Sequence, residues 1–438
     1  MIRTRRTAHP RRAAPAVAPV APVSPYDVLV RDADLLRRSG QYDAAVKAFH
    51  AITLRFPQRS DAFSNLGGML QAAGHPLVAL QAITRAIELD PTNVSALLNS
   101  AEIMKDFGEW DAVRDTYDAA LAAAPDSATI RFARALHLLM LGQWHEGWRE
   151  HEQRWLVPDM PLATSRLGTP QWDGTPLDGQ RILLDHEQGL GDQLMFARFV
   201  PDVAARGGQV TLRCSAPLIS LFRTLPGVTK VVSDGDLIPT HDVRASLMSL
   251  PHLLGIDSPD NVSGAAYLQP IGDCPAEIRC AFGPGRTRVG LVWSGNPQHR
   301  NDARRSLPPR MLAPLLGAPD VDFVSLQRHD GRTEFPEPLR YGVRDLGGAL
   351  HTFNNTAHAL MKLDLLVTVD TSVAHLAGAL GVRTLLLLPF VPDWRWMVNC
   401  DDTPWYRSVT LVRQDSLFEW APVITRVRAH IDAITHTP

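Results

Sequence analysis

Two glycines and an aspartate follow the apolar run 181–185, in the segment Glu187-Gln188-Gly189-Leu190-Gly191-Asp192. The glycines permit a tight turn and a close approach of the backbone to a ligand. Asp192 would open the following helix. The segment is not a full GxGxxG, since position 194 is leucine. The alternative is that Asp192 only caps a helix after a glycine-rich turn.

A second candidate site begins where another predicted strand ends, at Asp370, and a helix follows at once. Thr371 and Ser372 would place hydroxyl and backbone N–H groups at the N-terminus of that helix, which suits phosphate oxygens. His375 lies one turn further along. The alternative is a capped core helix with a buried, hydrogen-bonded histidine.

A third candidate is the polar loop Trp293-Ser294-Gly295-Asn296-Pro297, which is followed by Arg300, Arg304 and Arg305. Ser294 and Asn296 offer polar groups. The guanidinium groups, whose forked donors suit phosphate, are expected to point into the same cleft as the second candidate. A solvated surface loop is the alternative.

Aromatic residues surround an arginine in the segment Asp393-Trp394-Arg395-Trp396, and Trp405-Tyr406 follow shortly after. Such rings stack on a base or a sugar, or they simply pack in the core. Asp234-Gly235-Asp236 has the DxD pattern of metal-dependent sugar transfer, but it falls in a predicted turn. We therefore predict no metal site.

The N-terminal part of the chain repeats with a period of 34 residues. Glycines, prolines and small residues each recur at this spacing, which predicts a helix hairpin repeated over residues 25–156. The hairpins would form a concave groove for a peptide or protein partner, or they only stabilise or dimerise the molecule. The repeating positions are Gly40, Gly74, Gly108 and Gly142; Pro57, Pro91 and Pro125; and Ala33, Gly67, Ala101 and Ala135.

The pattern changes after residue 157 to short apolar runs that alternate with helical segments. This alternation is typical of a parallel, doubly wound sheet and predicts two Rossmann-like halves, 157–286 and 287–418, which leave a C-terminal segment at 419–438. Ligands of such sheets bind at the carboxyl ends of the strands. The expected strands are 181–185, 209–214, 228–232, 289–293, 322–326, 365–369 and 384–388, and the expected helices of the second half are 307–317, 355–362 and 372–380.

Composition excludes several classes of protein. A formal net charge of −2 argues against a generally basic nucleic-acid binder, and four cysteines without a CxxC pair argue against a disulfide framework or a structural zinc site. No apolar run approaches the roughly 18 residues needed to span a membrane. Prolines interrupt residues 1–24, which predicts a disordered tail rather than a signal peptide, and a cytoplasmic protein.

Five stretches occur together in one order: EQGLGDQLMFARF, VGLVWSGNPQHRND, TAHALMKLDLLVTVDTSVAHLAGALG, DWRWM and TPWY. With the repeats, they resemble bacterial tetratricopeptide-repeat proteins that carry a C-terminal glycosyltransferase domain related to the lipopolysaccharide heptosyltransferases of glycosyltransferase family 9. The resemblance covers about residues 30–420. It implies an α-solenoid followed by a GT-B fold, with the acceptor on the first half, the nucleotide-sugar on the second, and a final helix that crosses back onto the first half.

The same resemblance implies roles for individual residues. Asp192 matches the general base, in an acceptor-side loop that includes Gln188, Gly189 and Gly191. Arg305 falls where the family has a basic residue near the donor phosphates, usually a lysine. Arg407 and Val412 depart from the family's pattern, which commonly has proline and an aromatic residue there. The donor-binding residues would be Ser294, Asn296, Arg305, Asp370, Thr371, Ser372 and His375.

The activity implied is an inverting, metal-independent transfer of a sugar from a nucleotide-sugar, without a cofactor. The leading hypothesis is a protein acceptor held by the repeats. The first alternative keeps the chemistry and moves the acceptor to lipopolysaccharide or another glycan. The second is a non-catalytic repeat scaffold with a degenerate transferase domain.

Overall fold

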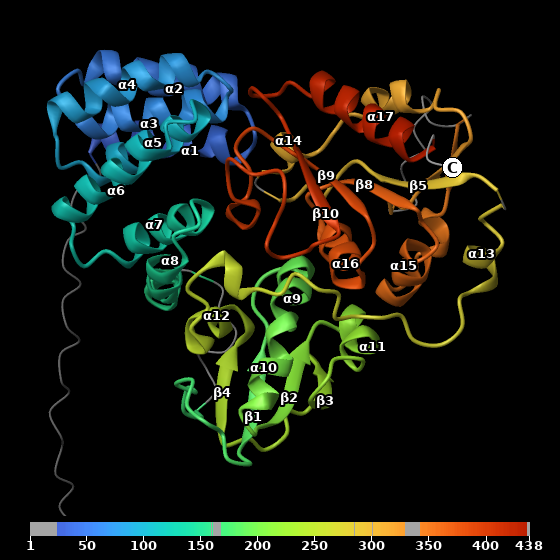
Figure 1. The fold of residues 1–438 in the computed structure, drawn as a ribbon. Coiled ribbons are helices and arrows are strands. Elements are labelled where there is room, and N and C mark those ends of the chain that lie inside the picture. Colours follow the sequence, from blue (N-terminus) through green and yellow to red (C-terminus); the bar gives the residue numbers. More distant parts are fainter. Residues whose placement is uncertain are drawn as a thin grey trace, which may run out of the picture. The chain divides into compact units, whose positions relative to one another are not determined.

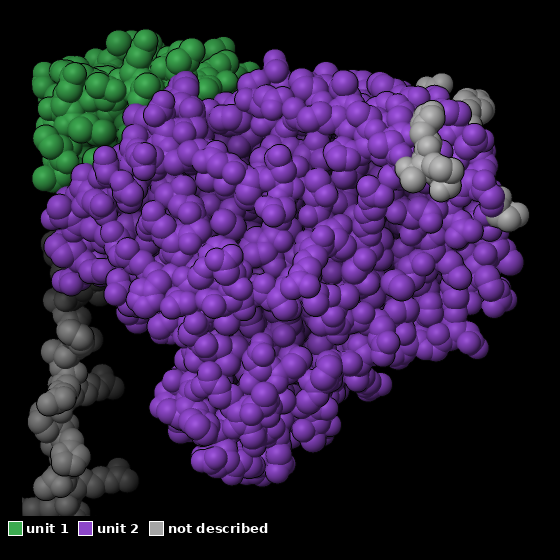
Figure 2. Space-filling model, viewed as in Figure 1, with its two compact units in different colours: residues 1–103 green, residues 104–438 purple. Residues whose placement is uncertain are grey.

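The computed structural model describes residues 24–158, 160, 168–283, 285–299, 301–328 and 342–435. The chain divides into two compact units, Met1–Ile103 and Met104–Pro438, which Figure 2 colours separately. The predicted tail, apart from Ser24, and Arg300 of the predicted arginine loop lie outside the described residues. We describe each unit by itself.

The first unit consists of paired helices, as the 34-residue period predicts. Gly40 and Gly74 adopt φ of 77° and 83° where one helix ends and the next begins, a left-handed conformation that glycine adopts at little cost. Gly67 lies against Ile83 of the neighbouring helix, where a Cβ would meet the isoleucine side chain at 2.5 Å. The helices are α1 (Pro25–Arg38), α2 (Tyr42–Arg55), α3 (Ser60–Ala72) and α4 (Pro76–Leu89), and α5 (Val94–Asp106) continues into the second unit.

The second unit begins with three further helices of the repeat: α6 (Trp110–Ala123), α7 (Ala128–Met140) and α8 (Trp144–His151). Trp144 and Trp148 of α8 are almost fully buried. The ring of Trp144 stacks on Trp405 with centroids 4.8 Å apart, and Trp148 meets Phe196 edge to face at 6.0 Å. The last helix of the repeat is therefore part of the core of the α/β region.

The first sheet has four parallel strands in the order β3-β2-β1-β4 (Figure 1). Its strands are β1 (Arg181–Asp185), β2 (Gln209–Cys214), β3 (Val228–Ser233) and β4 (Val243–Ser246). The accompanying helices are α9 (Leu190–Phe196), α10 (Val200–Ala205), α11 (Ile219–Phe222) and α12 (Leu250–Leu254).

The second sheet has six parallel strands in the order β10-β9-β8-β5-β6-β7. Every residue of the central strands β8 (Leu365–Val369) and β9 (Thr384–Leu388) is buried, as expected for a sheet covered on both faces. The other strands are β5 (Thr287–Val292), β6 (Val321–Ser325), β7 (Val343–Asp345) and β10 (Val409–Arg413). Short helices α13 (Ala276–Arg279) and α14 (Asp302–Arg305) and the longer α15 (Phe353–Leu360) and α16 (Ser372–Leu380) connect them.

The final helix α17 (Ala421–Thr435) corrects one prediction. We expected residues 419–438 to cross back onto the first half. Instead, the apolar stripe that includes Val423, Val427 and Ile431 is buried in the core of the second sheet, with residues such as Leu365 of β8. The described part of the helix therefore covers its own half, because its apolar face fits that sheet.

The predicted fold class is confirmed: a helical repeat region is followed by two parallel, Rossmann-like α/β halves. The predicted boundaries between domains stay predictions. None of the helices in the described ranges is long and apolar enough to cross a membrane.

Candidate functional site

Asp192 lies at the third position of α9 and faces the second half of the α/β region. Its Oδ2 accepts a hydrogen bond from the backbone N–H of Gly189 at 3.0 Å, so the capping role is present. Its Oδ1 accepts from Nη2 of Arg395, which comes from the second half. The aspartate therefore both caps a helix and joins the two halves. Gln188 is exposed, with φ of 58°.

Gly191 lies at a contact between the two halves. A Cβ on this residue would lie 2.9 Å from Cδ2 of His375 in α16. The small size of this glycine lets the start of α9 contact α16 of the other half (Figure 1), a role that the sequence did not reveal.

The N-terminus of α16 follows β8 directly, as predicted. Thr371 caps it by accepting from the N–H of Val373 at 3.3 Å, and Ser372 is the first helical residue. Both side chains are partly exposed. The remaining N–H groups of this helix end make it a suitable place for an anion.

His375 is buried one turn into α16. Its Nδ1 is hydrogen-bonded to Oη of Tyr406 at 3.0 Å, and its ring stacks on Trp396 with centroids 5.0 Å apart. Burial and the positive charge of Arg395 lower the pKa of His375 to about 3. The imidazole is therefore neutral at physiological pH and takes part through hydrogen bonds rather than charge.

The carboxylates of Asp370, which directly precedes the N-cap of α16, and Asp393 influence each other's ionisation. Burial and the negative charge of Asp393 raise the pKa of Asp370 to about 6, although Arg305 acts in the opposite direction. Burial alone would also raise the pKa of Asp393, but Arg395 outweighs it and holds this pKa below its usual value. Asp370 is thus the member of the pair that more readily takes up a proton.

Arg395 is at the centre of the cluster. Its Nη1 donates to Asp393 Oδ1 at 2.7 Å, its Nη2 donates to Asp192, and its Cζ lies 4.3 Å from the ring centroid of Trp394. Burial opposes its charge, but the carboxylates of Asp192 and Asp393 prevail and raise its pKa above the usual value. Sequence reasoning noted this arginine among aromatic residues but did not connect it with Asp192.

Arg305 lies close enough to Asp370 to influence its ionisation. Its guanidinium contacts Asp302 at 3.2 Å and lies beside Gly295, and its charge lowers the pKa of Asp370. The charge of Arg305 thus acts on Asp370, and the role of Arg305 toward the donor phosphates stays a prediction.

Two other members of the arginine loop do not join them. Arg304 binds Asp106 at the end of α5, at 2.5 Å, so the expectation that it points into the cleft is wrong. Asn296 is exposed, and its Oδ1 accepts from the N–H of Gln298 within its own loop. The backbone N–H of Ser294 is bound to Gln327 at 3.0 Å.

The rings that could have stacked on a ligand are mostly packed in the core. Trp396, Trp405 and Tyr406 are fully buried, and Trp405 donates its indole N–H to the carbonyl oxygen of Arg395 at 2.8 Å. This favours packing over stacking on a base or sugar, and it shows that the rings fix the position of Arg395.

Glu187, in the glycine-rich segment, has a structural contact that the sequence did not suggest. It forms a two-point ion pair with Arg154, at 2.9 and 2.7 Å, and neither side chain is exposed. Arg154 follows α8, so this pair holds the end of the repeat against the turn that carries Asp192.

Both aspartates of the DxD segment form hydrogen bonds with other residues of the first half. Asp234 pairs with His186 at 2.7 Å, and Asp236 accepts from the N–H of Ser233 at 2.7 Å. In the part of the chain that the structure describes, no group of three or more histidine, cysteine, aspartate or glutamate side chains could hold a metal ion.

Comparison with known proteins adds a family for the helical repeats. Two family models of the tetratricopeptide repeat match residues 31–94 and 70–137. Residues 31–137 are tetratricopeptide repeats. Protein FlbA of Caulobacter vibrioides is 26% identical over 435 residues, which cover 90% of this chain and 70% of FlbA.

Solved structures are similar to parts of the chain. A glycosyltransferase of family 9 from Veillonella parvula has a TM-score of 0.42 and 13% identity, over 56% of this chain and 88% of that one. The chaperone SycD of Yersinia enterocolitica, solved with a peptide of the translocator YopD, has a TM-score of 0.24 and 21% identity, over 25% of this chain and 85% of that one.

Proposed function

We propose that this protein is an inverting glycosyltransferase that moves a sugar from a nucleotide-sugar to an acceptor hydroxyl. The observation that carries the proposal is the contact between α9, which holds Asp192, and α16 of the other half, whose first residue Ser372 has its Cα 3.7 Å from the Cβ position of Gly191. One side offers a carboxylate base and the other an anion site, which are the two groups that a displacement at an anomeric carbon needs.

In the proposed reaction the acceptor oxygen attacks the anomeric carbon from the face opposite the nucleotide. Asp192 takes the hydroxyl proton as the new C–O bond forms. The bond between the anomeric carbon and the phosphate oxygen breaks, and its electron pair leaves with the nucleotide. The N–H groups of Thr371 and Ser372 and the guanidinium of Arg305 stabilise the resulting charge, so these fixed groups supply what a metal ion would otherwise provide.

We propose a protein as the acceptor. The support is the repeat region, because stacked helix hairpins offer an extended concave surface and a folded chain of this kind commonly holds polypeptide. A lipopolysaccharide or other glycan acceptor would use the same chemistry, so the reaction products must distinguish the two.

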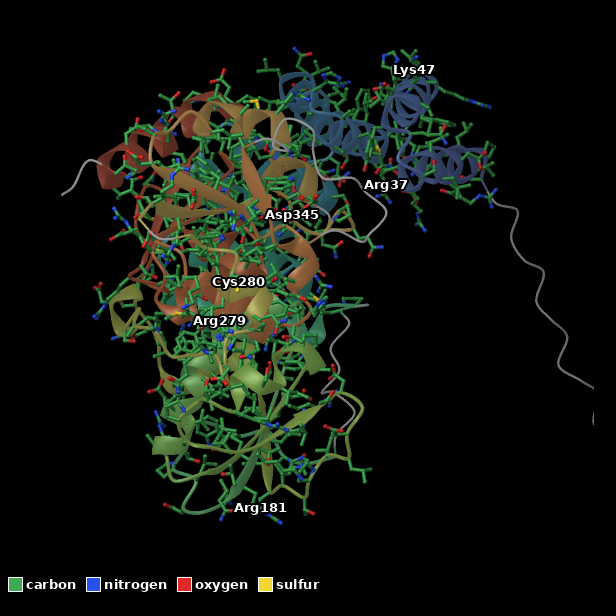
Figure 3. All side chains as sticks on the ribbon, turned by 90° about the vertical axis from the view of Figure 1, so that its right-hand side faces the viewer. Arg37, Lys47, Arg181, Arg279, Cys280 and Asp345 are labelled. Carbon is green, nitrogen blue, oxygen red and sulfur yellow. The ribbon has the colours of Figure 1, made fainter. Side chains whose placement is uncertain are left out.

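The test is sugar transfer from a panel of nucleotide-sugars labelled in the sugar, with cell protein and cell glycan as separate acceptors. Asp192→Asn should lower turnover by about 10²–10⁴-fold, because the amide does not accept the proton. Asp242→Asn is the matched control: Asp242 also pairs with an arginine, Arg181, which Figure 3 labels at the end of the first half away from the second sheet.

Three results would count against parts of the proposal. Equal turnover in wild type and Asp192→Asn removes the base assignment. Label found only in glycan removes the protein acceptor. No transfer from any donor to either acceptor, by a folded wild-type protein, favours the scaffold alternative.

A further inference from the structure

Both carboxylate oxygens of Asp192 are engaged in the structure. Oδ2 accepts from the N–H of Gly189, and Oδ1 accepts from Arg395 of the second half. The carboxylate is also largely covered, with 15% of its side chain exposed. Each oxygen therefore already accepts one hydrogen bond, and because the carboxylate is so largely covered, an acceptor hydroxyl would reach it more readily once one of these contacts is released.

The contact to Arg395 is the one that can be exchanged. Gly189 is the residue that caps α9, and its N–H is fixed by the backbone. Arg395 has a second anchor, because Asp393 accepts from both its Nη1 and its backbone N–H, at 2.7 and 3.1 Å. The Nη2 group can therefore change partner while Asp393 and the ring of Trp394 keep the guanidinium in place.

The alternative partner for Nη2 is an anion at the N-terminus of α16. Arg395 is adjacent to this helix, because the ring of the next residue, Trp396, stacks on His375 of α16 with centroids 5.0 Å apart. Its positive charge also lowers the pKa of both Asp370 and His375. A phosphate placed there would be within the same charged cluster. Guanidinium groups bind phosphate strongly through forked donors, so a phosphate competes effectively with a single carboxylate oxygen.

We propose that Arg395 is a donor-binding residue that exchanges Asp192 for the phosphate of the bound nucleotide. The inference rests on the proposed function and deepens it. It explains why the residue assigned as the base is held by an arginine: donor binding removes Nη2 from Asp192 and leaves Oδ1 free for the acceptor. The protein would then bind the donor before its base becomes available.

If Arg395 exchanges Asp192 for phosphate, substitution of Asp192 should change the affinity for nucleotide. In wild type, a nucleotide must displace Asp192 from Arg395, so removing the negative charge of Asp192 should strengthen nucleotide binding. Asp192→Asn should therefore bind a nucleoside diphosphate about five- to fifty-fold more tightly, the range expected for loss of one competing charged hydrogen bond. Loss of a nearby negative charge would by itself strengthen phosphate binding, but that gain would persist without Arg395, whereas a gain from the exchange requires Arg395.

The experiment measures the dissociation constants of ADP, GDP, UDP, CDP and CMP by calorimetry, with the corresponding nucleosides as ligands without phosphate. Wild type, Asp192→Asn, Arg395→Gln, Arg395→Lys and the double variant Asp192→Asn with Arg395→Gln are compared, and Asp242→Asn is the matched control. Arg395→Gln should lose at least ten-fold in nucleotide affinity, and Arg395→Lys should recover part of it. In the double variant the gain from Asp192→Asn should vanish, and nucleoside affinity should not change in any variant.

Each outcome decides between the two proposals. Suppose that wild type transfers sugar. If Asp192→Asn then binds the nucleotide no more tightly than wild type, or if the substitution raises nucleotide affinity equally in the Arg395→Gln background, the exchange is wrong and the transferase proposal stands. If wild type neither binds a nucleotide nor transfers sugar, both proposals fail. Thermal unfolding shows whether each variant is folded before its affinity is interpreted. Arg395→Lys keeps the test valid if Arg395→Gln does not fold.

Discussion

Asp370 is the residue in the cluster whose charge is most sensitive to pH. Its pKa is raised from 3.8 to about 6 in the folded protein. The folded state thus favours the protonated form, and the corresponding stabilisation is complete below about pH 4 and is lost as the pH rises through 6. Asp370→Asn removes this dependence on pH. The melting temperature of the variant minus that of wild type should therefore increase between pH 4.5 and pH 7.

Thermal unfolding at a series of pH values measures this difference. Asp242→Asn is again the control, because the pKa of Asp242 is lowered to about 2 by its hydrogen bond to Arg181, and the group stays ionised over the whole range. A difference between Asp370→Asn and wild type that is constant from pH 4.5 to 7 would show that Asp370 titrates normally.

Gly191 offers a second prediction at the residue scale. Replacing an unstrained helical glycine by alanine usually stabilises a protein by about 0.5–1 kcal/mol. At Gly191 the new Cβ would lie 2.9 Å from the ring of His375, so we expect Gly191→Ala to destabilise instead and to slow sugar transfer. Gly235→Ala is the control, since a Cβ there meets nothing within 4 Å. Stabilisation by Gly191→Ala, in urea unfolding, would show that the halves need not approach so closely.

At the scale of elements, the sequence predicted best where burial is uniform. The strands 181–185, 365–369 and 384–388 and the helix 372–380 have the predicted ends, because apolar runs bounded by polar or turn residues leave few alternatives. The strand 209–214 also has the predicted ends, and its signal is the alternation of apolar and polar residues. Strands β4, β7 and β10 were not predicted. In β4 and β7, three or four residues with an arginine inside give no periodic signal.

Prolines and tertiary packing explain the other differences. The expected helix 307–317 is a 3₁₀ segment, Pro309–Leu315, because prolines remove its backbone donors. The contact between Asp192 and Arg395 joins residues 203 positions apart in the sequence. Neither motif alone indicates this pair; it follows only from how the two sheets face each other.

The burial of helix α8 leads to a prediction about stability. Trp148 is 2% exposed and contacts the rings of Trp394, Trp405 and Phe196. Trp148→Ala should therefore destabilise the protein by about 3–5 kcal/mol, measured by urea unfolding. Leu237→Ala, at a side chain that is 94% exposed, should change stability by less than about 0.5 kcal/mol. Similar small effects of both substitutions would mean that α8 is not part of the core.

At the scale of the whole molecule, the boundary between compact units does not coincide with the end of the repeats. The first unit ends at residue 103, while the repeat pattern continues through Gly142. The last repeats belong to the α/β unit through two independent contacts: the tryptophans of α8 and the ion pair of Arg154 with Glu187. The last repeats, from α6 to α8, therefore belong to the compact unit of the α/β halves, and we expect that unit to need them for its stability.

Two truncations separate these roles. A chain that begins at Asn93 keeps α5 to α8, and we expect it to melt near the temperature of the α/β unit in the full chain and to hydrolyse the nucleotide-sugar, but to lose transfer to protein. A chain that begins at Val157 lacks Arg154 and leaves Glu187 as a buried, unpaired charge, which costs about 3–5 kcal/mol before the lost tryptophans are counted. We expect that chain not to fold, as judged by circular dichroism and calorimetry. A cooperative melt of the chain that begins at Val157 would contradict the structural role of α8. Full transfer of sugar to protein by the chain that begins at Asn93 would place the acceptor site outside residues 1–92.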